Sequence, residues 1–593
     1  MWPLSKDEKK LKTADLVVER LIAWGVEVVF GLPGDGINGF IEALRQRADR
    51  IRFVLVRHEE AAAFMASGYA KFTGRLGVCL ATSGPGAIHL LNGLYDAKLD
   101  GAPVLALTGQ TYHDLLGSRY QQEVDLLALF KDVAVFDQQI MGAAHAPVVI
   151  DAACRAAIGG RCVAHVTCPV DIQEQELEQD EKSEKNVAKH SVPEPGWQPP
   201  VVVPRRSDIQ RAAEVLNAGT KTAIIAGFGA LGARVLLEQA ADALAAPIVK
   251  PLRGKAVVPD DSPFTTGGIG LLGTDASEEA LEQCDSLLIV GSSFPYMDFY
   301  PKPGAARAVQ IDADPTRIGL RYPIEVGLTG DAQATLEELV PLLARRADRS
   351  FLERAQQMMV SWRELMHERS TRADRPLKPE VVMRELSSLL ADDALVSCDT
   401  GAHTTWVARH IDMRGDRRFA VSGNLATMAP GLPYAIAAQI AYPDRQSVAI
   451  VGDGGFTMLM GEFATAVKHK LPVKVVIIRN DVLGMIEWEQ MVFLGNPEYG
   501  VELSPIDFAK FADACGGVGL TCEKPKDVRG TLEALLATEG PAIAEMVVDR
   551  YEPPMPARIK AKQAAHLAKA LMRGEPHRGR IALTLFRNKV HEL

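Results

Sequence analysis

The chain has 593 residues, of which 47% are hydrophobic and 24% are charged, and its formal net charge is −10. At roughly 150 residues per domain, this length predicts three or four globular domains. The negative charge gives no reason to expect nucleic acid binding, and no apolar run reaches the roughly 20 residues of a transmembrane helix. The charged start, MWPLSKDEKKLK, predicts no secretory signal, so we expect a cytoplasmic protein.

The first candidate functional residue is a glutamate between a strand and a helix. Residues 51–57 (IRFVLVR) predict a strand, and residues 58–71 predict a helix rich in small residues. Glu59 lies at the junction of the strand and the helix, next to Ala61 to Phe64. Desolvation there would raise its pKa and suit it to proton donation. The structural alternative is an acid favoured by the helix dipole.

Glycines mark a second turn in this block. Ser83 to Gly86 connects a predicted strand to a helix, and His89 lies one helical turn farther on. Glycine lets the backbone approach a ligand closely. We treat His89 as secondary, because a histidine near a helix start is often structural.

Two changes of composition divide the chain. Residues 174–206 turn from charged to proline-rich and predict an extended linker, whereas residues 345–378 predict a helical connection. The blocks between them alternate strands with helices, which predicts α/β folds with doubly wound parallel sheets. The predicted parts are an N-terminal domain (1–180), a linker (181–204), a central domain (205–342), a connecting helix (343–378), a third domain (379–550) and a tail (551–593).

The central domain contains a literal GxGxxG at Gly227, Gly229 and Gly232, after a strand and before a helix. Alone, this pattern suggests a dinucleotide such as NAD. The second strand, APIVK, ends at Lys250 and not at the acid that would hold a ribose hydroxyl. The pattern is therefore weaker evidence for NAD than it looks.

The third domain offers a place for a metal and a diphosphate. Residues 446–451 and 473–479 predict strands, and residues 458–470 predict a helix between them. Right-handed crossover makes these strands parallel neighbours, which places Asp453 and Asn480 together at the ligand-binding edge. Their oxygens suit Mg²⁺, and the glycines around Asp453 admit a phosphate. Residues 394–410 predict another strand, turn and helix that could seat a diphosphate.

The segment GDGGFTMLMGEFATAVKHKLPVKVVIIRN resembles the thiamin-diphosphate fingerprint of the pyruvate oxidase and acetolactate synthase superfamily. The resemblance implies Mg²⁺ bound by Asp453, Asn480 and the carbonyl of Val482. The segment RHEEAAAFMASGYAKFTG is also similar to that family, which implies that Glu59 hydrogen-bonds N1′ of the aminopyrimidine and promotes loss of the thiazolium C2 proton. It further implies that the first and third domains share a fold.

The same resemblance implies further site residues. Met428 would support the bent cofactor, and residues 401–403 would line its phosphates. The implied thiamin diphosphate set is Gly401, Ala402, His403, Ala426, Thr427, Met428, Asp453, Gly454, Gly455, Asn480, Val482, Leu483, Gly484 and Met485.

The substrate side departs from the family. Gln121 stands where the family has Phe, before Gln122 and Glu123, so we expect a more polar pocket. Glu489 lies nine residues after Asn480, as in pyruvate oxidases, whereas acetolactate synthases have Trp there. We therefore expect Glu59, Gln121, Gln122 and Glu489 to be the catalytic residues.

Two segments of the central domain, GIGLLGTDASEEALEQCDSLLIVGSSFPYMDFYP and AVQIDADPTRIGLRYP, resemble nearly residue for residue the FAD-binding domain of the pyruvate oxidase and quinone-linked pyruvate dehydrogenase branch. The resemblance implies a Rossmann-like central domain. The implied FAD residues are Ile269, Gly270, Leu271, Leu272, Ser292, Ser293, Phe294, Pro295, Tyr296 and Asp312. Many family members keep this domain empty.

The resemblance implies an enzyme that decarboxylates a 2-oxo acid, with pyruvate as the default substrate, and passes electrons to FAD and then to quinone or O₂. The alternatives are an acetolactate synthase-like carboligase with structural FAD, a related C–C bond lyase, or a binding protein without turnover. The family also implies a homodimer or homotetramer. The basic tail predicts either peripheral contact with the inner membrane surface or a strap over its own subunit.

Overall fold

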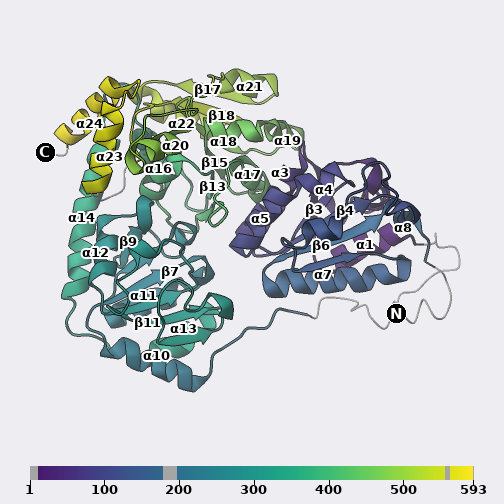
Figure 1. Cartoon of the computed structure of the whole chain (residues 1–593), viewed down its shortest axis with the longest axis horizontal. Helices are drawn as coiled ribbons and strands as arrows, with labels where there is room; N and C mark the ends of the chain where they lie inside the picture. The colour runs from purple at the N-terminus through teal and green to yellow at the C-terminus, as the bar shows by residue number, and fades with distance from the viewer. Residues whose placement is uncertain (1–10, 178–196, 555–560, 592–593) are drawn as a thin grey trace. The chain divides into compact units, whose positions relative to one another are not determined.

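The computed structural model describes residues 11–177, 197–554 and 561–591 and contains three six-stranded parallel sheets (Figure 1). The predicted extended linker falls largely on residues 178–196, and part of the predicted tail is residues 555–560 and 592–593. Both lie outside the described residues, as do residues 1–10 at the charged start. No helix in the described ranges is long and apolar enough to cross a bilayer.

The first sheet has the strand order β2-β1-β3-β4-β6-β5. Its strands are β1 (Val28–Gly31), β2 (Arg52–Leu55), β3 (Gly77–Ala81), β4 (Val104–Gln110), β5 (Phe136–Gln139) and β6 (Val163–Pro169). The helices are α1 (Thr13–Ala23), α2 (Asn38–Arg45), α3 (Glu59–Thr73), α4 (Pro85–His89), α5 (Leu91–Asp100), α6 (Leu126–Phe130), α7 (Ala146–Gly160) and α8 (Val170–Glu174). Apolar side chains of α1, α2 and α7 share one core with the strands.

The second sheet has the order β12-β11-β10-β7-β8-β9, the Rossmann arrangement of two halves around a central first strand. Its strands are β7 (Thr222–Ala226), β8 (Ile248–Lys250), β9 (Thr265–Gly268), β10 (Ser286–Val290), β11 (Arg307–Asp312) and β12 (Val326–Thr329). The helices are α10 (Arg206–Ala218), α11 (Arg234–Leu244), α12 (Asp275–Gln283), α13 (Ala332–Leu339) and the predicted connecting helix, α14 (Ser350–Ser370).

The third sheet has the order β14-β13-β15-β16-β18-β17, which repeats the order of the first sheet. Its strands are β13 (Leu395–Cys398), β14 (Arg418–Ala420), β15 (Ser447–Gly452), β16 (Lys474–Arg479), β17 (Val518–Cys522) and β18 (Ala542–Val547). The helices of this region are α15 (Pro379–Leu389), α16 (Ala402–His410), α17 (Gly431–Ala441), α18 (Asp453–Met458), α19 (Phe463–Lys468), α20 (Gly484–Trp488), α21 (Phe508–Ala514) and α22 (Val528–Ala537), followed by α23 (Ala561–Met572) and α24 (Arg578–His591). The three sheets confirm the predicted fold class.

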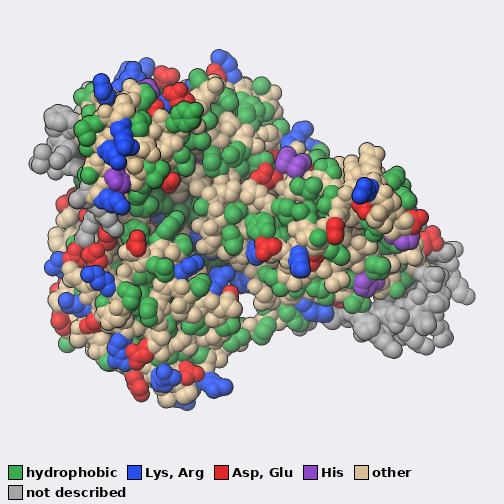
Figure 2. All heavy atoms as spheres, viewed as in Figure 1, with side chains coloured by type: hydrophobic (Ala, Val, Ile, Leu, Met, Phe, Trp, Pro, Cys, Tyr) green, Lys and Arg blue, Asp and Glu red, His purple; other side chains and the backbone are tan. Residues whose placement is uncertain are grey.

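Contacts group the chain into two compact units. One unit contains the first sheet with residues 422–444 and 459–471, and the other contains the second and third sheets. In the first unit the small residues of α3 admit α17, because a Cβ added to Gly68 would lie 2.7 Å from the Tyr434 ring. On the face in Figure 2, acidic and basic side chains are interspersed among hydrophobic ones.

Candidate functional site

The carboxyl edge of the third sheet brings Asp453 and Asn480 together. Strands β15 and β16 are parallel neighbours, as predicted. The Asp453 carboxylate accepts hydrogen bonds from the amides of Asn480 (3.2 Å) and Asp481 (2.7 Å), and the Asn480 side chain accepts one from Val482 (3.3 Å). Burial raises the pKa of Asp453 to about 6, and a bound cation would favour its ionised form. Asp453 is therefore hydrogen-bonded to the turn that holds Asn480 and Val482, which brings the three predicted metal ligands together.

The predicted helix between these strands is wrong in its bounds. Helix α18 already begins at Asp453, whose carboxylate accepts a hydrogen bond from the Gly454 amide at 3.0 Å. A break at Leu459 and a 3-10 turn, Met460–Glu462, separate it from α19. The prediction placed no helix at residues 453–457, where the Asp453 carboxylate stabilises the first helical turn.

His403 gives this edge an unused polar atom. Residues 401–403 start α16, and a Cβ added to Gly452 would lie 3.0 Å from His403 Nδ1. His403 is buried, and its Nε2 has no hydrogen-bond partner among the described residues. Burial lowers its pKa to about 4, so the ring is neutral at pH 7. An orphaned ring nitrogen beside close-packed glycines fits the diphosphate and Mg²⁺ of a thiamin cofactor.

In the first unit, Glu59 lies at the start of α3 and is only 6% exposed. Its Oε2 lies 3.0 Å from His89 Nδ1, and the rings of His58 and His89 stack with centroids 4.4 Å apart. A Cβ added to Gly86 would lie 3.0 Å from Glu59 Oε1. The structure therefore joins Glu59 with His89, which the sequence had left as secondary, and with the glycine turn.

The two glutamines differ in position. Gln122 is half-buried and accepts a hydrogen bond from the Ser83 hydroxyl at 3.0 Å, so it stands beside the glycine turn. Its φ is +62°, a left-handed conformation. Gln121 is exposed and has no such contact among the described hydrogen bonds. The carboxylate of Glu123 accepts bonds from loop amides, including Tyr120 at 3.0 Å, and so shapes this loop.

Met428 stands on a loop with two unusual residues. Ala426 and Ala429 on either side have φ of +54° and +86°. The Thr427 amide donates to Ser422 Oγ at 3.3 Å, and Asn92 donates to Thr427 Oγ1 at 3.2 Å. Loops of this kind are typical of ligand sites, where the surroundings hold an unfavourable backbone in place.

Glu489 is exposed at the start of a π-helix, Glu489–Phe493, which directly follows α20. Such π-helical turns are frequent at functional sites. Its neighbour Glu487, which the sequence did not indicate, is fully buried, and its pKa is raised to about 9 by burial and by Glu498. Its charged neighbours Glu498 and Arg550 lie 11 and 63 residues farther along the chain, so no local sequence period records this cluster.

The predicted flavin residues lie at the carboxyl ends of β9, β10 and β11. A Cβ on Gly270 would lie 2.9 Å from the Phe294 ring, so residues 269–272 and 292–296 meet. Asp312 ends β11, is 8% exposed and has its pKa raised by burial. A glycine cradle with a buried acid at a strand end fits a dinucleotide with ribose hydroxyls.

The GxGxxG pattern is explained by internal packing. A Cβ on Gly227 would lie 2.4 Å from the carbonyl oxygen of Gly291, and the Gly229 amide donates to the same oxygen at 3.0 Å. The loop after β10 thus occupies the space that these glycines leave. This agrees with the weak dinucleotide signal read from the second strand.

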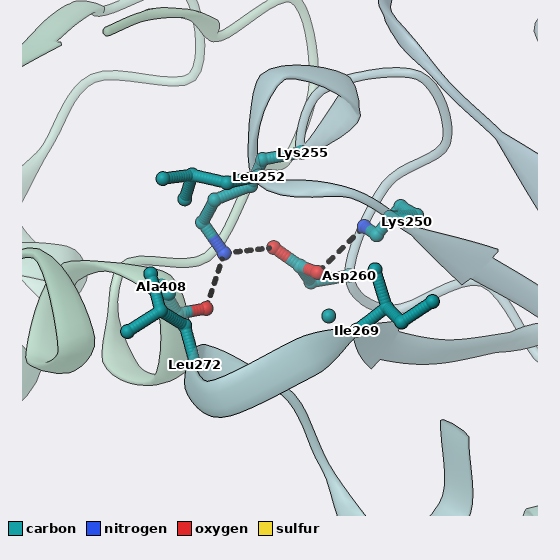
Figure 3. A pocket seen from close by; sticks show the side chains of 8 residues that line it. Lys250, Leu252, Lys255, Asp260, Ile269, Leu272 and Ala408 are labelled. Carbon is teal, nitrogen blue, oxygen red and sulfur yellow. Dashed lines mark hydrogen bonds and ion pairs between the residues drawn. The ribbon is translucent and has the colours of Figure 1, made fainter. Parts of the chain in front are cut away.

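Lys250 belongs to a small pocket beside residues 269–272 (Figure 3). Its Nζ donates to Asp260 Oδ1 at 2.7 Å, while Lys255 donates to Asp260 Oδ2 at 3.2 Å and to the Ala408 carbonyl at 2.9 Å. Two lysine side chains share one carboxylate, and burial lowers the pKa of Lys250. The end of β8 is therefore used for an ion-pair network and not for a ribose-binding acid.

Comparison with known proteins gives three matching family models. They describe the N-terminal thiamine pyrophosphate binding domain (residues 11–129), the central domain (209–339) and the C-terminal thiamine pyrophosphate binding domain (399–546) of thiamine pyrophosphate enzymes. The matches fall on the three sheets described above.

Full-length relatives agree with these matches. The chain is 41% identical to YdaP of Bacillus subtilis, described as a thiamine pyrophosphate-containing protein, over 95% of this chain and 96% of that one. It is 34% identical to pyruvate oxidase of Lactiplantibacillus plantarum, over 84% and 81% of the two chains. It is 31% identical to acetolactate synthase of Mycobacterium bovis, over 91% and 88%. The chain therefore belongs to the thiamine pyrophosphate-dependent enzyme family.

Proposed function

We propose that this enzyme decarboxylates a 2-oxo acid, with pyruvate as the first candidate, and passes the electrons to FAD and then to quinone or O₂. The observation that carries the oxidase assignment is the position of Glu489, nine residues after Asn480 and at the start of a π-helix. The likeness to a pyruvate oxidase supports it. The meeting of residues 269–272 with residues 292–296 at Gly270 and Phe294 supports bound FAD, which both candidate functions share.

The residues have distinct roles in this proposal. Asp453, Asn480 and the Val482 carbonyl would hold Mg²⁺, and residues 401–403 would line the diphosphate. Thiamin diphosphate supplies a carbon nucleophile for the ketone carbon of the substrate. Glu59 would hold a proton at its carboxyl group, kept oriented by His89 Nδ1 at 3.0 Å. Gln122 and Glu489 would contact the substrate.

A second candidate is carboligation, or cleavage of a larger diketone, with FAD in a structural role. The exposed amide of Gln121 and the likeness to acetolactate synthases favour it. The proposal also includes a cytoplasmic location and assembly of the chain as a homodimer or homotetramer. Contact with the inner membrane surface through the tail is tested separately below.

The deciding experiment incubates the purified protein with pyruvate, Mg²⁺ and thiamin diphosphate, with and without an artificial electron acceptor. Acetate that requires the acceptor supports the oxidase. Acetolactate formed without an acceptor would overturn it. The visible spectrum tests FAD independently, because a colourless preparation that does not take up added FAD contradicts the flavin assignment.

A further inference from the structure

A buried charge network connects α3 and α5 of the first unit. Lys71 on α3, 3% exposed at its side chain, donates to both oxygens of Asp96 (2.9 Å each), to Asp100 (2.7 Å) and to the hydroxyl of Tyr434 (2.6 Å). Ser67 donates to Asp96 at 2.6 Å. One ammonium group thus faces two buried carboxylates. Ion pairs buried in this way are costly unless every partner is hydrogen-bonded.

The carboxylate oxygens of Asp100 also accept hydrogen bonds from the loop that carries Met428. Its Oδ2 accepts a hydrogen bond from the Gly423 amide at 3.1 Å. Its Oδ1 accepts bonds from the amide and the side chain of Asn424, both at 3.0 Å. Asn424 also donates to the Leu99 carbonyl at 2.8 Å. The first residues of the loop are therefore fixed to the end of α5 by four hydrogen bonds.

The rest of the same loop is held in an unfavourable conformation. Ala426 and Ala429 both have positive φ, and each such residue costs on the order of 1–3 kcal/mol unless the surroundings enforce it. Beyond Ala429 the chain enters α17, where the Tyr434 hydroxyl is hydrogen-bonded to Asp96. The strained segment is thus tied at both ends to the same charge network.

We propose that Asp100, ion-paired with Lys71, is a positioning residue that sets the conformation of residues 423–430 and thereby places Met428 for the cofactor. This role rests on the proposed function and on the cofactor-supporting role that the family resemblance implies for Met428, whereas the fixing of the loop by Asp100 does not. Neutralising Asp100 removes an acceptor for the loop amides and turns one oxygen into a donor. The loop then loses the restraint that offsets its strained backbone.

The test uses the full-length variants Asp100→Asn and Asn424→Ala, with Asp285→Asn as a matched control. Asp285 also fixes a turn, by accepting bonds from the Thr220 and Lys221 amides at 2.9 Å, but it lies in the central domain. We expect D100N to weaken thiamin diphosphate binding at least about tenfold by calorimetry, and N424A to weaken it less, because its backbone amide remains. D285N should bind as the wild type does.

Hydrogen exchange of residues 423–430 in cofactor-free protein provides the second readout. We expect the amides of this loop to exchange faster in D100N than in D285N, even where the two variants lower the melting temperature equally. Unchanged exchange, or unchanged cofactor affinity in D100N, would overturn the proposal. If the wild-type protein does not bind thiamin diphosphate, the proposed function is wrong. Hydrogen exchange of residues 423–430 would then still test whether Asp100 fixes the loop.

Discussion

Glu462 is a buried carboxylate directly behind the candidate catalytic glutamate. Its Oε1 accepts hydrogen bonds from the amides of Arg57 (2.8 Å) and His58 (3.0 Å), and its Oε2 accepts one from Thr465 (2.8 Å). The two amides immediately precede Glu59 in the chain. Burial raises the pKa of Glu462 to about 7. The backbone that positions Glu59 is therefore hydrogen-bonded to a carboxyl group, that of Glu462, which titrates near neutrality.

This pKa predicts a pH dependence of stability. The folded chain binds the proton of Glu462 more tightly than the unfolded chain, whose pKa is 4.5. The stability contributed by this group is thus fully present below pH 4.5 and is lost as the pH rises through about 7. In Glu462→Gln an oxygen still accepts from both amides, so we expect a smaller fall in the free energy of unfolding between pH 5 and pH 8. Equal pH slopes for both proteins, in denaturant titrations, would contradict the assignment.

Glu59 itself is tested by an isosteric change. We expect Glu59→Gln to lower the rate of thiazolium C2 proton exchange by on the order of 100-fold or more, because the amide cannot hold the transferred proton. Binding of Mg²⁺ and thiamin diphosphate should persist. The neighbour Glu60, whose carboxylate accepts from Asn92 at 2.7 Å, provides the control Glu60→Gln. The exchange rate is measured by NMR after acid quench, and an unchanged rate in E59Q would refute its role.

At the scale of elements, the glycines after β7 allow the loop after β10 to pack closely against them, and stability measurements can test this role. A Cβ on Gly227 would lie 2.4 Å from the Gly291 carbonyl oxygen and 2.6 Å from Ser292 Cβ. We expect Gly227→Ala to destabilise the protein by about 1–3 kcal/mol, by overpacking, with or without added NAD. Gly530 in α22 has nothing within 4 Å of an added Cβ, so Gly530→Ala should stabilise by about 0.5–1 kcal/mol. Denaturant midpoints compare the two, and NAD-dependent protection would argue for a nucleotide site.

The sequence predicted those elements whose pattern is local. Strands β15 and β16 were predicted from β-branched runs, and crossover handedness then placed Asp453 beside Asn480. The start of α18 was missed, because a side-chain hydrogen bond and not residue propensity decides it. Asp100 was missed for another reason. Its partners in the Met428 loop, Gly423 and Asn424, lie more than 300 residues away in sequence, and no local period records that contact.

At the scale of the whole molecule, the C-terminal helices pack on their own chain. Ala570 of α23 and Ile581 of α24 are fully buried in one cluster with Trp488, Met491 and Val492. The Glu575 carboxylate accepts a hydrogen bond from the Glu498 amide at 2.9 Å. The described part of the tail is thus attached to the π-helix that begins at Glu489. This arrangement supports the strap and leaves the buried apolar side chains unavailable to lipid.

Two substitutions on α24 separate the strap from a lipid anchor. Ile581 is fully buried, whereas Leu583 is 48% exposed, so Ile581→Ala should destabilise the protein by about 2–5 kcal/mol and Leu583→Ala by less than about 0.5 kcal/mol. We expect full-length protein to stay unbound in flotation with anionic liposomes, as does protein truncated after residue 554. The opposite result has three parts: the full-length chain floats, the truncated chain does not, and Leu583→Ala reduces flotation without lowering the free energy of unfolding. That result would show that the exposed face of α24 binds lipid, and it would contradict the strap as the function of the tail.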